Sequence, residues 1–271
     1  MTPLPTARLG RCGVVVSVLG IGTGTFGFGY QSRQSRQAPA QLGALLRHAY
    51  DRGLTWWDTS DDYGTHAHVR AGLLGLDRGR VQLASKTHAA TADAARRSLD
   101  LALDELGVDY LDLYFLHDVD EPGELERRAG AFEALCAARD AGRIRALGLS
   151  THNIDTLEAC VAMSGLDVVM TNFNKFEDHM DAGLRHYVAA LEAHAAAGRG
   201  VLVMKAVGEG RLARVADESI RWNLTRPYVH GVLVGMIDAA EVDRNAATAA
   251  ATYSSSESSG ITTKWTSTRS R

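Results

Sequence analysis

Four side chains that can hold or transfer protons occur where short apolar runs of the sequence end. Asp58 and Lys86 end two successive runs, His117 ends a third, and Tyr63 follows soon after Asp58. A lysine in an apolar environment loses its proton unless a carboxylate balances its charge, and Asp58 is the candidate partner. The ammonium is expected to lower the phenol pKa of Tyr63 from about 10, which would make it a better proton donor. With His117 orienting a carbonyl oxygen, the four residues predict carbonyl protonation coupled to hydride delivery.

Each of these residues also has a plainer interpretation. A single aspartate at a strand end is commonly a helix or turn cap, Tyr63 could belong to a turn with Gly64, and His117 could be a buried core histidine. Their occurrence at successive strand ends favours the chemical interpretation. A different chemistry, in which Lys86 forms a Schiff base in an isomerase or lyase, stays open as an alternative.

The elements that would position these residues recur along the chain. Starts of neighbouring apolar runs, from the second run on, lie between 24 (168−144) and 33 (144−111) residues apart. One strand, one crossover helix and two loops need about 30 residues. The runs are residues 18–21, 55–57, 81–84, 111–116, 144–149, 168–170, 201–204 and 229–234.

The segments between the runs have helical periodicity, which is clearest over residues 95–106 and 125–136. Pro39 is a candidate first helical residue, and Gly107 and Gly142 are candidate helix ends. Eight units predict a closed parallel (β/α)8 barrel, an α/β fold. The alternative is an open doubly wound sheet, which the lack of GxGxxG after the first run disfavours.

Two segments lie outside the repeat, so the predicted barrel unit is residues 1–250. Residues 8–17 are expected to form a small hairpin that plugs the barrel end opposite the four chemical residues. Residues 251–271 are rich in Ser and Thr, and we expect a disordered tail there. Polar residues follow most of the runs, and in such a barrel they would share one mouth: Asp58, Lys86, His117, Ser150, Asn172, Asn174 and Lys205.

Composition limits the partners of the chain. A net charge of −3 makes nucleic acid an improbable partner. With no apolar run of about 18 residues and no basic-then-apolar leader, no membrane contact is expected. The three scattered cysteines are typical of a reducing compartment, so we expect a cytoplasmic protein, whose oligomeric state the sequence does not determine.

His66 and His68 would point to different helix faces, so no metal site is expected. Residues 33–36 are interpreted as a solvated loop, or else as a lip for an anionic substrate.

Several short motifs occur in a fixed order along the chain: 19–24 (LGIGTG), 58–60 (DTS) with Tyr63-Gly64, Lys86, 109–113 (DYLDL) with His117, 148–150 (GLS), Phe173-Asn174, 208–212 (GEGRL), and Gly235 with Asn245. In this order they resemble the aldo-keto reductases over residues 8 to 250.

The resemblance implies an NAD(P)H-dependent reductase of an aldehyde, ketone or sugar-type carbonyl, or the reverse alcohol oxidation. It implies Tyr63 as acid/base, Lys86 and Asp58 as its tuning partners, and His117 as the residue that positions the substrate oxygen. The implied partners are NADP or NAD and a small-molecule carbonyl substrate. The implied cofactor residues are Gly22, Thr23, Ser150, Thr151, Met170, Met204, Lys205, Gly208, Gly210, Arg211, Leu212, Gly235 and Asn245.

Some positions depart from that pattern. Met170 stands where the family commonly has Gln, and Met204 where an aromatic residue often stacks on the nicotinamide. Asp238 and Glu241 occupy positions where cations would meet a 2′-phosphate, with Arg244 nearby, so we expect weak discrimination between NADPH and NADH. The family's C-terminal loop over the substrate is also replaced by the Ser/Thr-rich tail. These departures leave a second hypothesis, a cofactor-binding regulatory barrel with little turnover.

Overall fold

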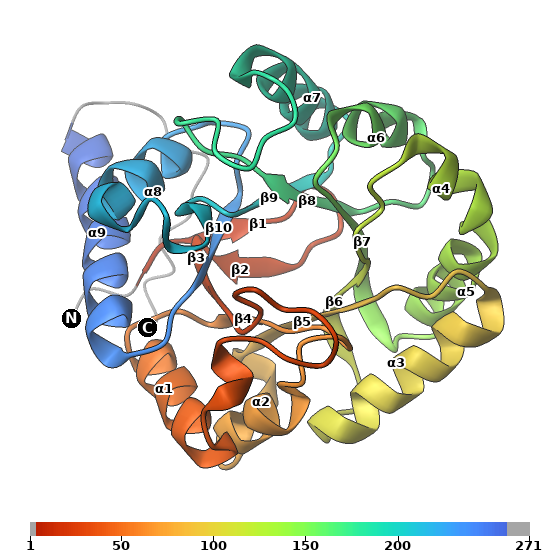
Figure 1. The fold of residues 1–271 in the computed structure, drawn as a ribbon, viewed down its shortest axis with the longest axis horizontal. Coiled ribbons are helices and arrows are strands. Elements are labelled where there is room, and N and C mark those ends of the chain that lie inside the picture. The colour runs from red at the N-terminus through yellow and green to blue at the C-terminus, as the bar shows by residue number, and fades with distance from the viewer. Residues whose placement is uncertain (1–3, 259–271) are drawn as a thin grey trace.

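A computed structural model describes residues 4–258 of the chain. Eight parallel strands close into a barrel in which β10 pairs with β3 (Figure 1). This confirms the predicted (β/α)8 fold and overturns the open-sheet alternative. The strands are β3 (Leu19–Gly22), β4 (Trp56–Asp58), β5 (Gln82–Thr87), β6 (Leu111–Leu116), β7 (Ile144–Thr151), β8 (Val168–Asn172), β9 (Gly200–Met204) and β10 (Gly231–Gly235).

Helices follow the strands and form the outer ring of the barrel. Pro39 begins the first helix, and Gly107 ends the third with a left-handed φ of 68°, both as the sequence predicts. The helices are α1 (Pro39–Asp51), α2 (His66–Leu73), α3 (Ala92–Leu106), α4 (Pro122–Arg127), α5 (Ala129–Asp140), α6 (Ile154–Ala159), α7 (Leu184–Ala196), α8 (Ala216–Leu224) and α9 (Ala239–Ser258). Short 3-10 turns are η1 (Gln34–Arg36), η2 (Arg78–Arg80), η3 (Cys160–Ala162), η4 (Gly208–Gly210) and η5 (Ala213–Val215).

The N-terminal hairpin closes one end of the barrel. Its strands β1 (Thr6–Arg8) and β2 (Val15–Ser17) pair antiparallel. Leu9 and Val16 are buried in the cluster of apolar side chains inside the barrel, together with Trp56 and Val168. The backbone N–H of Arg11 donates a hydrogen bond to the carbonyl of Gly198, just before β9 begins. The hairpin therefore lies at the amino ends of the strands, opposite the end that carries His117, as predicted.

The helical segment around residues 122–140 is broken where the periodicity indicated a continuous helix. The break falls at Arg128, whose φ and ψ are −105° and 11°. Its buried guanidinium donates to the carbonyl oxygens of Ala89, His117 and Thr87. The chain therefore leaves helical geometry at the residue whose guanidinium binds carbonyl groups at the ends of β5 and β6.

The predicted boundary at residue 250 needs correction. Helix α9 continues to Ser258, and Thr252 and Tyr253 are buried against the barrel. Small residues suppressed the periodic signal there, because Ala, Ser and Thr can pack a helix closely without giving a strong apolar stripe. The rest of the expected tail, residues 259–271, lies outside the described residues. Among the helices of residues 4–258, none is long and apolar enough to cross a bilayer.

Candidate active site

The four candidate residues meet at the carboxyl end of the barrel. Lys86, at the end of β5, donates through Nζ to Asp58 Oδ2 at 2.6 Å and to the Thr59 carbonyl at 2.8 Å. The same Nζ lies 4.8 Å from the centre of the Tyr63 ring. The Tyr63 hydroxyl lies 3.2 Å from His117 Nε2. Residues that are far apart in sequence thus form one connected group.

Close backbone approach holds the Tyr63 ring in place. Gly24 and Gly27 belong to the loop between β3 and α1, and each packs against the ring. A Cβ on Gly24 would lie 2.1 Å from Tyr63 Cε2, and a Cβ on Gly27 would lie 2.4 Å from Cδ1. Such distances are impossible for real side chains, so only glycine fits at both positions.

The ion pair between Lys86 and Asp58 is fully buried. Burial raises the pKa of Asp58, and the neighbouring ammonium opposes that rise. Asp58 Oδ1 receives no hydrogen bond from the described residues. The carboxylate therefore depends on Lys86 for its stabilisation.

The phenol of Tyr63 differs from the expectation. Burial raises the pKa of Tyr63 well above 10, and the negative charges of Asp58 and Asp118 add to the rise. Lys86 lies over the ring of Tyr63 and forms its ion pair with Asp58. The prediction of a lowered phenol pKa for Tyr63 is therefore wrong for the free protein. The hydroxyl stays protonated at neutral pH and remains available as a hydrogen-bond donor.

His117 is held in its neutral form between two hydroxyl groups. Its Nδ1 lies 3.1 Å from Ser60 Oγ, while Nε2 faces Tyr63. Burial lowers the pKa of His117 well below 6.5, and the charge of Lys86 lowers it further. A neutral imidazole has one donor and one acceptor nitrogen. If Ser60 donates to Nδ1, then Nε2–H points toward the space beside the Tyr63 hydroxyl.

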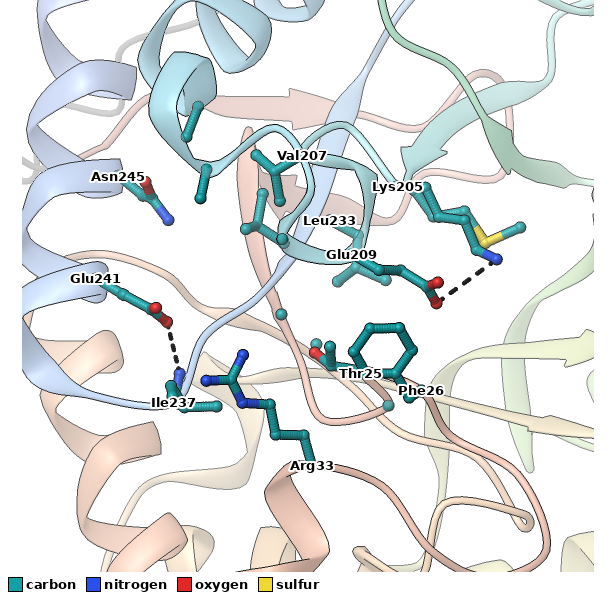
Figure 2. A pocket seen from close by; sticks show the side chains of 18 of the residues that line it. Thr25, Phe26, Arg33, Lys205, Val207, Glu209, Leu233, Ile237, Glu241 and Asn245 are labelled. Carbon is teal, nitrogen blue, oxygen red and sulfur yellow. Dashed lines mark hydrogen bonds and ion pairs between the residues drawn. The ribbon is translucent and has the colours of Figure 1, made fainter. Parts of the chain in front are cut away.

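An elongated cavity of 780 Å³ opens in front of this group. Tyr63, His117 and Asp58 line this cavity. The beginning of α9 lines it as well, and Figure 2 shows Glu241 and Asn245 there. Lys86 lies behind this wall, so it would act through Tyr63 and Asp58. A volume of this size suits a small organic ligand or cofactor.

The cofactor residues that the resemblance implied fall into two groups. Six line the cavity: Gly22, Met204, Lys205, Gly210, Gly235 and Asn245. Seven do not line it: Thr23, Ser150, Thr151, Met170, Gly208, Arg211 and Leu212.

Members of the second group have other contacts. The Thr23 hydroxyl donates to the Asp58 carbonyl at 2.9 Å, and Met170 is buried inside the barrel. Ser150 Oγ accepts a hydrogen bond from the backbone N–H of Asp118. Arg211 forms an ion pair with Asp178 at 2.7 Å. These contacts support the walls of the cavity.

The loop after β9 is braced by ion pairs. Lys205 Nζ lies 3.6 Å from Glu209 Oε1 across this loop, and both residues face the cavity (Figure 2). Both have positive φ angles, near 54° and 53°. The resemblance implied that residues of this loop contact the cofactor, and the structure adds the acidic side chain of Glu209 to the loop.

Arg33 belongs to the segment 33–36, which the sequence predicted to be a solvated loop or a lip for an anionic substrate, and it lines the cavity. It lies in the loop between β3 and α1, and Figure 2 shows its side chain extending toward Ile237 and Glu241. Gln34 and Gln37 bind the carbonyls of Met236 and Ile237, which fixes this loop against the turn after β10. The local sequence does not predict that this loop meets the turn after β10, since the contact joins segments that follow the first and last strands of the barrel.

The two acidic residues after β10 have a structural role. Asp238 Oδ1 accepts the backbone N–H of Glu241 at 2.8 Å, and Glu241 Oε2 accepts that of Ile237 at 2.9 Å. Both carboxylates thus bind free N–H groups at the start of α9, where the helix dipole favours negative charge.

Comparisons with known proteins identify the family of the chain. The model of the aldo/keto reductase family matches residues 18–218. A Schizosaccharomyces pombe protein named as an NADP(+) aldo-keto reductase is 31% identical over 193 residues, which are 64% of this chain and 53% of that protein. An aldo-keto reductase of Mycobacterium sp. (strain KMS) is 30% identical over 205 residues, covering 70% of this chain and 69% of the relative.

Solved structures show the same fold. An aldo-keto reductase structure from Pseudomonas aeruginosa superimposes with a TM-score of 0.77 at 25% identity, covering 92% of this chain and 95% of that one. The chain spans about half the length of the first two curated relatives, 53% and 51%.

Proposed function

Since this chain belongs to the aldo/keto reductase family, we propose that it is an NAD(P)H-dependent reductase of aldehydes, ketones or sugar-type carbonyls. The reverse reaction, alcohol oxidation, uses the same groups. One observation carries the proposal: the Tyr63 hydroxyl and His117 Nε2 lie 3.2 Å apart at the end of an elongated cavity, in front of a buried Lys86–Asp58 pair.

The catalytic roles follow from this arrangement. When bound, a reduced nicotinamide dinucleotide supplies the hydride that the carbonyl carbon accepts. A carbonyl oxygen placed between Tyr63 and His117 receives hydrogen bonds from both groups. Tyr63 gives its proton to this oxygen as negative charge develops there, which turns a carbonyl into an alcohol. Lys86 and Asp58 hold the Tyr63 ring in position and set the electrostatic environment around it.

The lining of the cavity supports its use as the cofactor site. Its residues include both Tyr63 and Asn245, and Gly210 leaves open space where a Cβ would otherwise project. We assign Gly22, Met204, Lys205, Gly235 and Asn245 to contacts along its length. Ser150 and Thr151, which end β7, would need a side-chain rotation to reach a ligand, because both are buried and hydrogen-bonded.

The experiment that tests this function has two stages. Fluorescence titration with NADPH and NADH measures cofactor binding, and loss of reduced-nicotinamide absorbance with a panel of aldehydes and ketones measures turnover. The proposal expects binding and turnover of at least one carbonyl class. Cofactor binding without turnover on the whole panel would support the regulatory-barrel hypothesis instead. Failure to bind either cofactor would contradict both.

Discrimination between cofactors should depend on Arg33. We expect wild type to favour NADPH by less than about a thousandfold, because the acidic residues beside Arg33 and Arg244 oppose part of their attraction. Arg33→Ala should weaken NADPH binding by about ten- to a hundredfold, the usual effect of losing one charge-assisted hydrogen bond, and should leave NADH binding nearly unchanged. Titrations at fixed, moderate salt measure both constants.

Arg36→Ala is the matched control for Arg33. Arg36 is an exposed arginine in the same loop and does not line the large cavity. Its removal should change neither constant. An equal loss for both cofactors in Arg33→Ala would place Arg33 at the pyrophosphate, and no loss at all would make it a solvated surface residue.

We also propose a partner and a compartment for this protein. We propose a small-molecule carbonyl substrate, for which the mouth of the cavity has room beside Tyr63. The cysteines Cys12, Cys136 and Cys160 are all unpaired, which supports a reducing compartment and a cytoplasmic location.

A further inference from the structure

Asp118, the residue that follows His117, has an unusual backbone conformation at the mouth of the cavity. Its φ of 47° lies in the left-handed region, which residues other than glycine, asparagine and aspartate seldom adopt. Two hydrogen bonds to Ser150 fix this conformation: the Asp118 N–H donates to Ser150 Oγ at 3.1 Å, and the Val119 N–H donates to the Ser150 carbonyl at 3.0 Å. The turn therefore directs the Asp118 side chain to the cavity wall, beside Tyr63 and His152.

The carboxylate of Asp118 accepts no hydrogen bond from the described residues. Oδ1 is buried, and it lies 3.3 Å from His117 Nε2 and 3.6 Å from His152 Nδ1 without hydrogen-bond geometry to either. The side chain as a whole is 35% exposed, and Asp118 is one of the residues that line the cavity. A carboxylate oxygen in this position has free acceptor capacity.

The neighbouring histidine does not satisfy this carboxylate because it is already bonded elsewhere. The His152 backbone N–H donates to Asp120 Oδ1 at 2.7 Å, and its Nδ1 lies 3.1 Å from Asp120 Oδ2. His117 is neutral, since burial lowers its pKa. Asp118 is thus a partly buried acceptor whose hydrogen-bond partner has to come from a molecule in the cavity.

The position of this acceptor bears on the substrate. The carbonyl oxygen would bind between Tyr63 and His117, and Asp118 Oδ1 lies 3.3 Å from His117 Nε2. A carboxylate this close repels the negative charge that develops on the oxygen of a simple aldehyde. A substrate with its own hydroxyl donor beside the carbonyl would satisfy the carboxylate and reduce this repulsion. Sites built to bind a hydroxyl group discriminate strongly against analogues that lack it.

We propose that Asp118 is a specificity-determining residue, and that its carboxylate accepts a hydrogen bond from a hydroxyl group on the carbon next to the reacting carbonyl. The preferred substrates are then hydroxycarbonyl compounds of the sugar type. This inference rests on the proposed reductase function.

A matched pair of substrates tests it. Propanal and 2-hydroxypropanal have the same carbon chain and differ by one hydroxyl group. Wild type should have a kcat/KM for 2-hydroxypropanal that is about ten- to a hundredfold higher than for propanal, the range expected for one charge-assisted hydrogen bond. Asp118→Gly should bring the two values close together, mainly by lowering the value for 2-hydroxypropanal.

The variants are chosen to keep the fold. Glycine and asparagine both tolerate a φ of 47°, so Asp118→Gly and Asp118→Asn remove the charge without new backbone strain. Asp118→Asn keeps an acceptor oxygen and should retain part of the preference. Asp93→Asn removes one negative charge from an exposed ion pair on α3 and should leave the ratio unchanged.

The possible outcomes separate the two hypotheses. Equal reduction of both aldehydes by wild type, or an equal loss on both in Asp118→Gly, would overturn the role of Asp118 while the reductase function stands. A wild type that binds cofactor but reduces neither aldehyde, nor any other carbonyl on the panel, would contradict the proposed function and this inference with it.

Discussion

Tyr63→Phe should lower turnover by about 10²–10⁴-fold while cofactor binding stays at the wild-type level. The change removes one hydroxyl group and almost no volume, so the ring can keep its contacts with Gly24 and Gly27. Water in the same place is a poorer and unoriented donor, which is why loss of a positioned general acid has an effect of this size. Steady-state reduction of a reactive aldehyde and nicotinamide fluorescence measure the two quantities separately.

The control for this variant is Tyr30→Phe. Tyr30 is an exposed tyrosine in the loop between β3 and α1, and its hydroxyl has no hydrogen bond in the described part of the chain. Its variant should turn over like wild type. If Tyr63→Phe were equally active, the assignment of Tyr63 would be wrong, and His117 would become the first alternative donor to test.

Lys86→Met should lower both stability and turnover. Removal of the Lys86 ammonium leaves the Asp58 carboxylate buried without a countercharge. Breaking a buried ion pair from one side costs about 3–5 kcal/mol of unfolding free energy. Turnover should fall as well, because the Tyr63 ring loses the ammonium that lies 4.8 Å from its centre. Urea denaturation measures the first effect, and steady-state kinetics at a permissive temperature measures the second.

A double variant separates the two effects of Lys86. Lys86→Met combined with Asp58→Asn removes both charges, so part of the lost stability should return, whereas turnover should stay low. Lys175→Met is the surface control: Lys175 pairs with Glu218 at a partly exposed site, where an ion pair contributes about 0–1 kcal/mol. Wild-type stability in Lys86→Met would show that Asp58 is protonated in the folded protein and would contradict the ion-pair assignment.

Much of the architecture could be predicted from local sequence patterns. Short apolar runs at intervals of about 30 residues gave the eight strands, because a parallel strand buried on both faces needs an apolar run and a crossover helix needs a fixed length of chain. Pro39 and Gly107 marked helix ends through backbone preferences that do not depend on tertiary contacts. The periodicity did not predict the helix break at Arg128, where a buried side-chain contact interrupts the helix. It also did not predict the part of α9 beyond residue 250, where small residues give no strong apolar stripe.

The candidate site shows the same division between local and long-range causes. The positions of Asp58, Lys86 and His117 were predictable, because residues that end parallel strands must meet at one edge of the barrel. Tyr63 was singled out with them because it follows Asp58 closely, and the order of motifs added the loop after β9. The catalytic role of Tyr63 and the binding role of this loop stay proposals.

Only the tertiary structure decided the electrostatics and the shape of the cavity. The pKa of Tyr63 rises because burial outweighs the nearby ammonium, and burial is not visible in the sequence. Arg33 reaches the start of α9 only because β3 and β10 are neighbours in the closed barrel. Asp118 gained importance from a left-handed backbone fixed by Ser150 on the adjacent strand. Sequence periodicity determined which elements form and which of their ends come together, whereas solvent exclusion and contacts across the closed barrel determined what the side chains there can do.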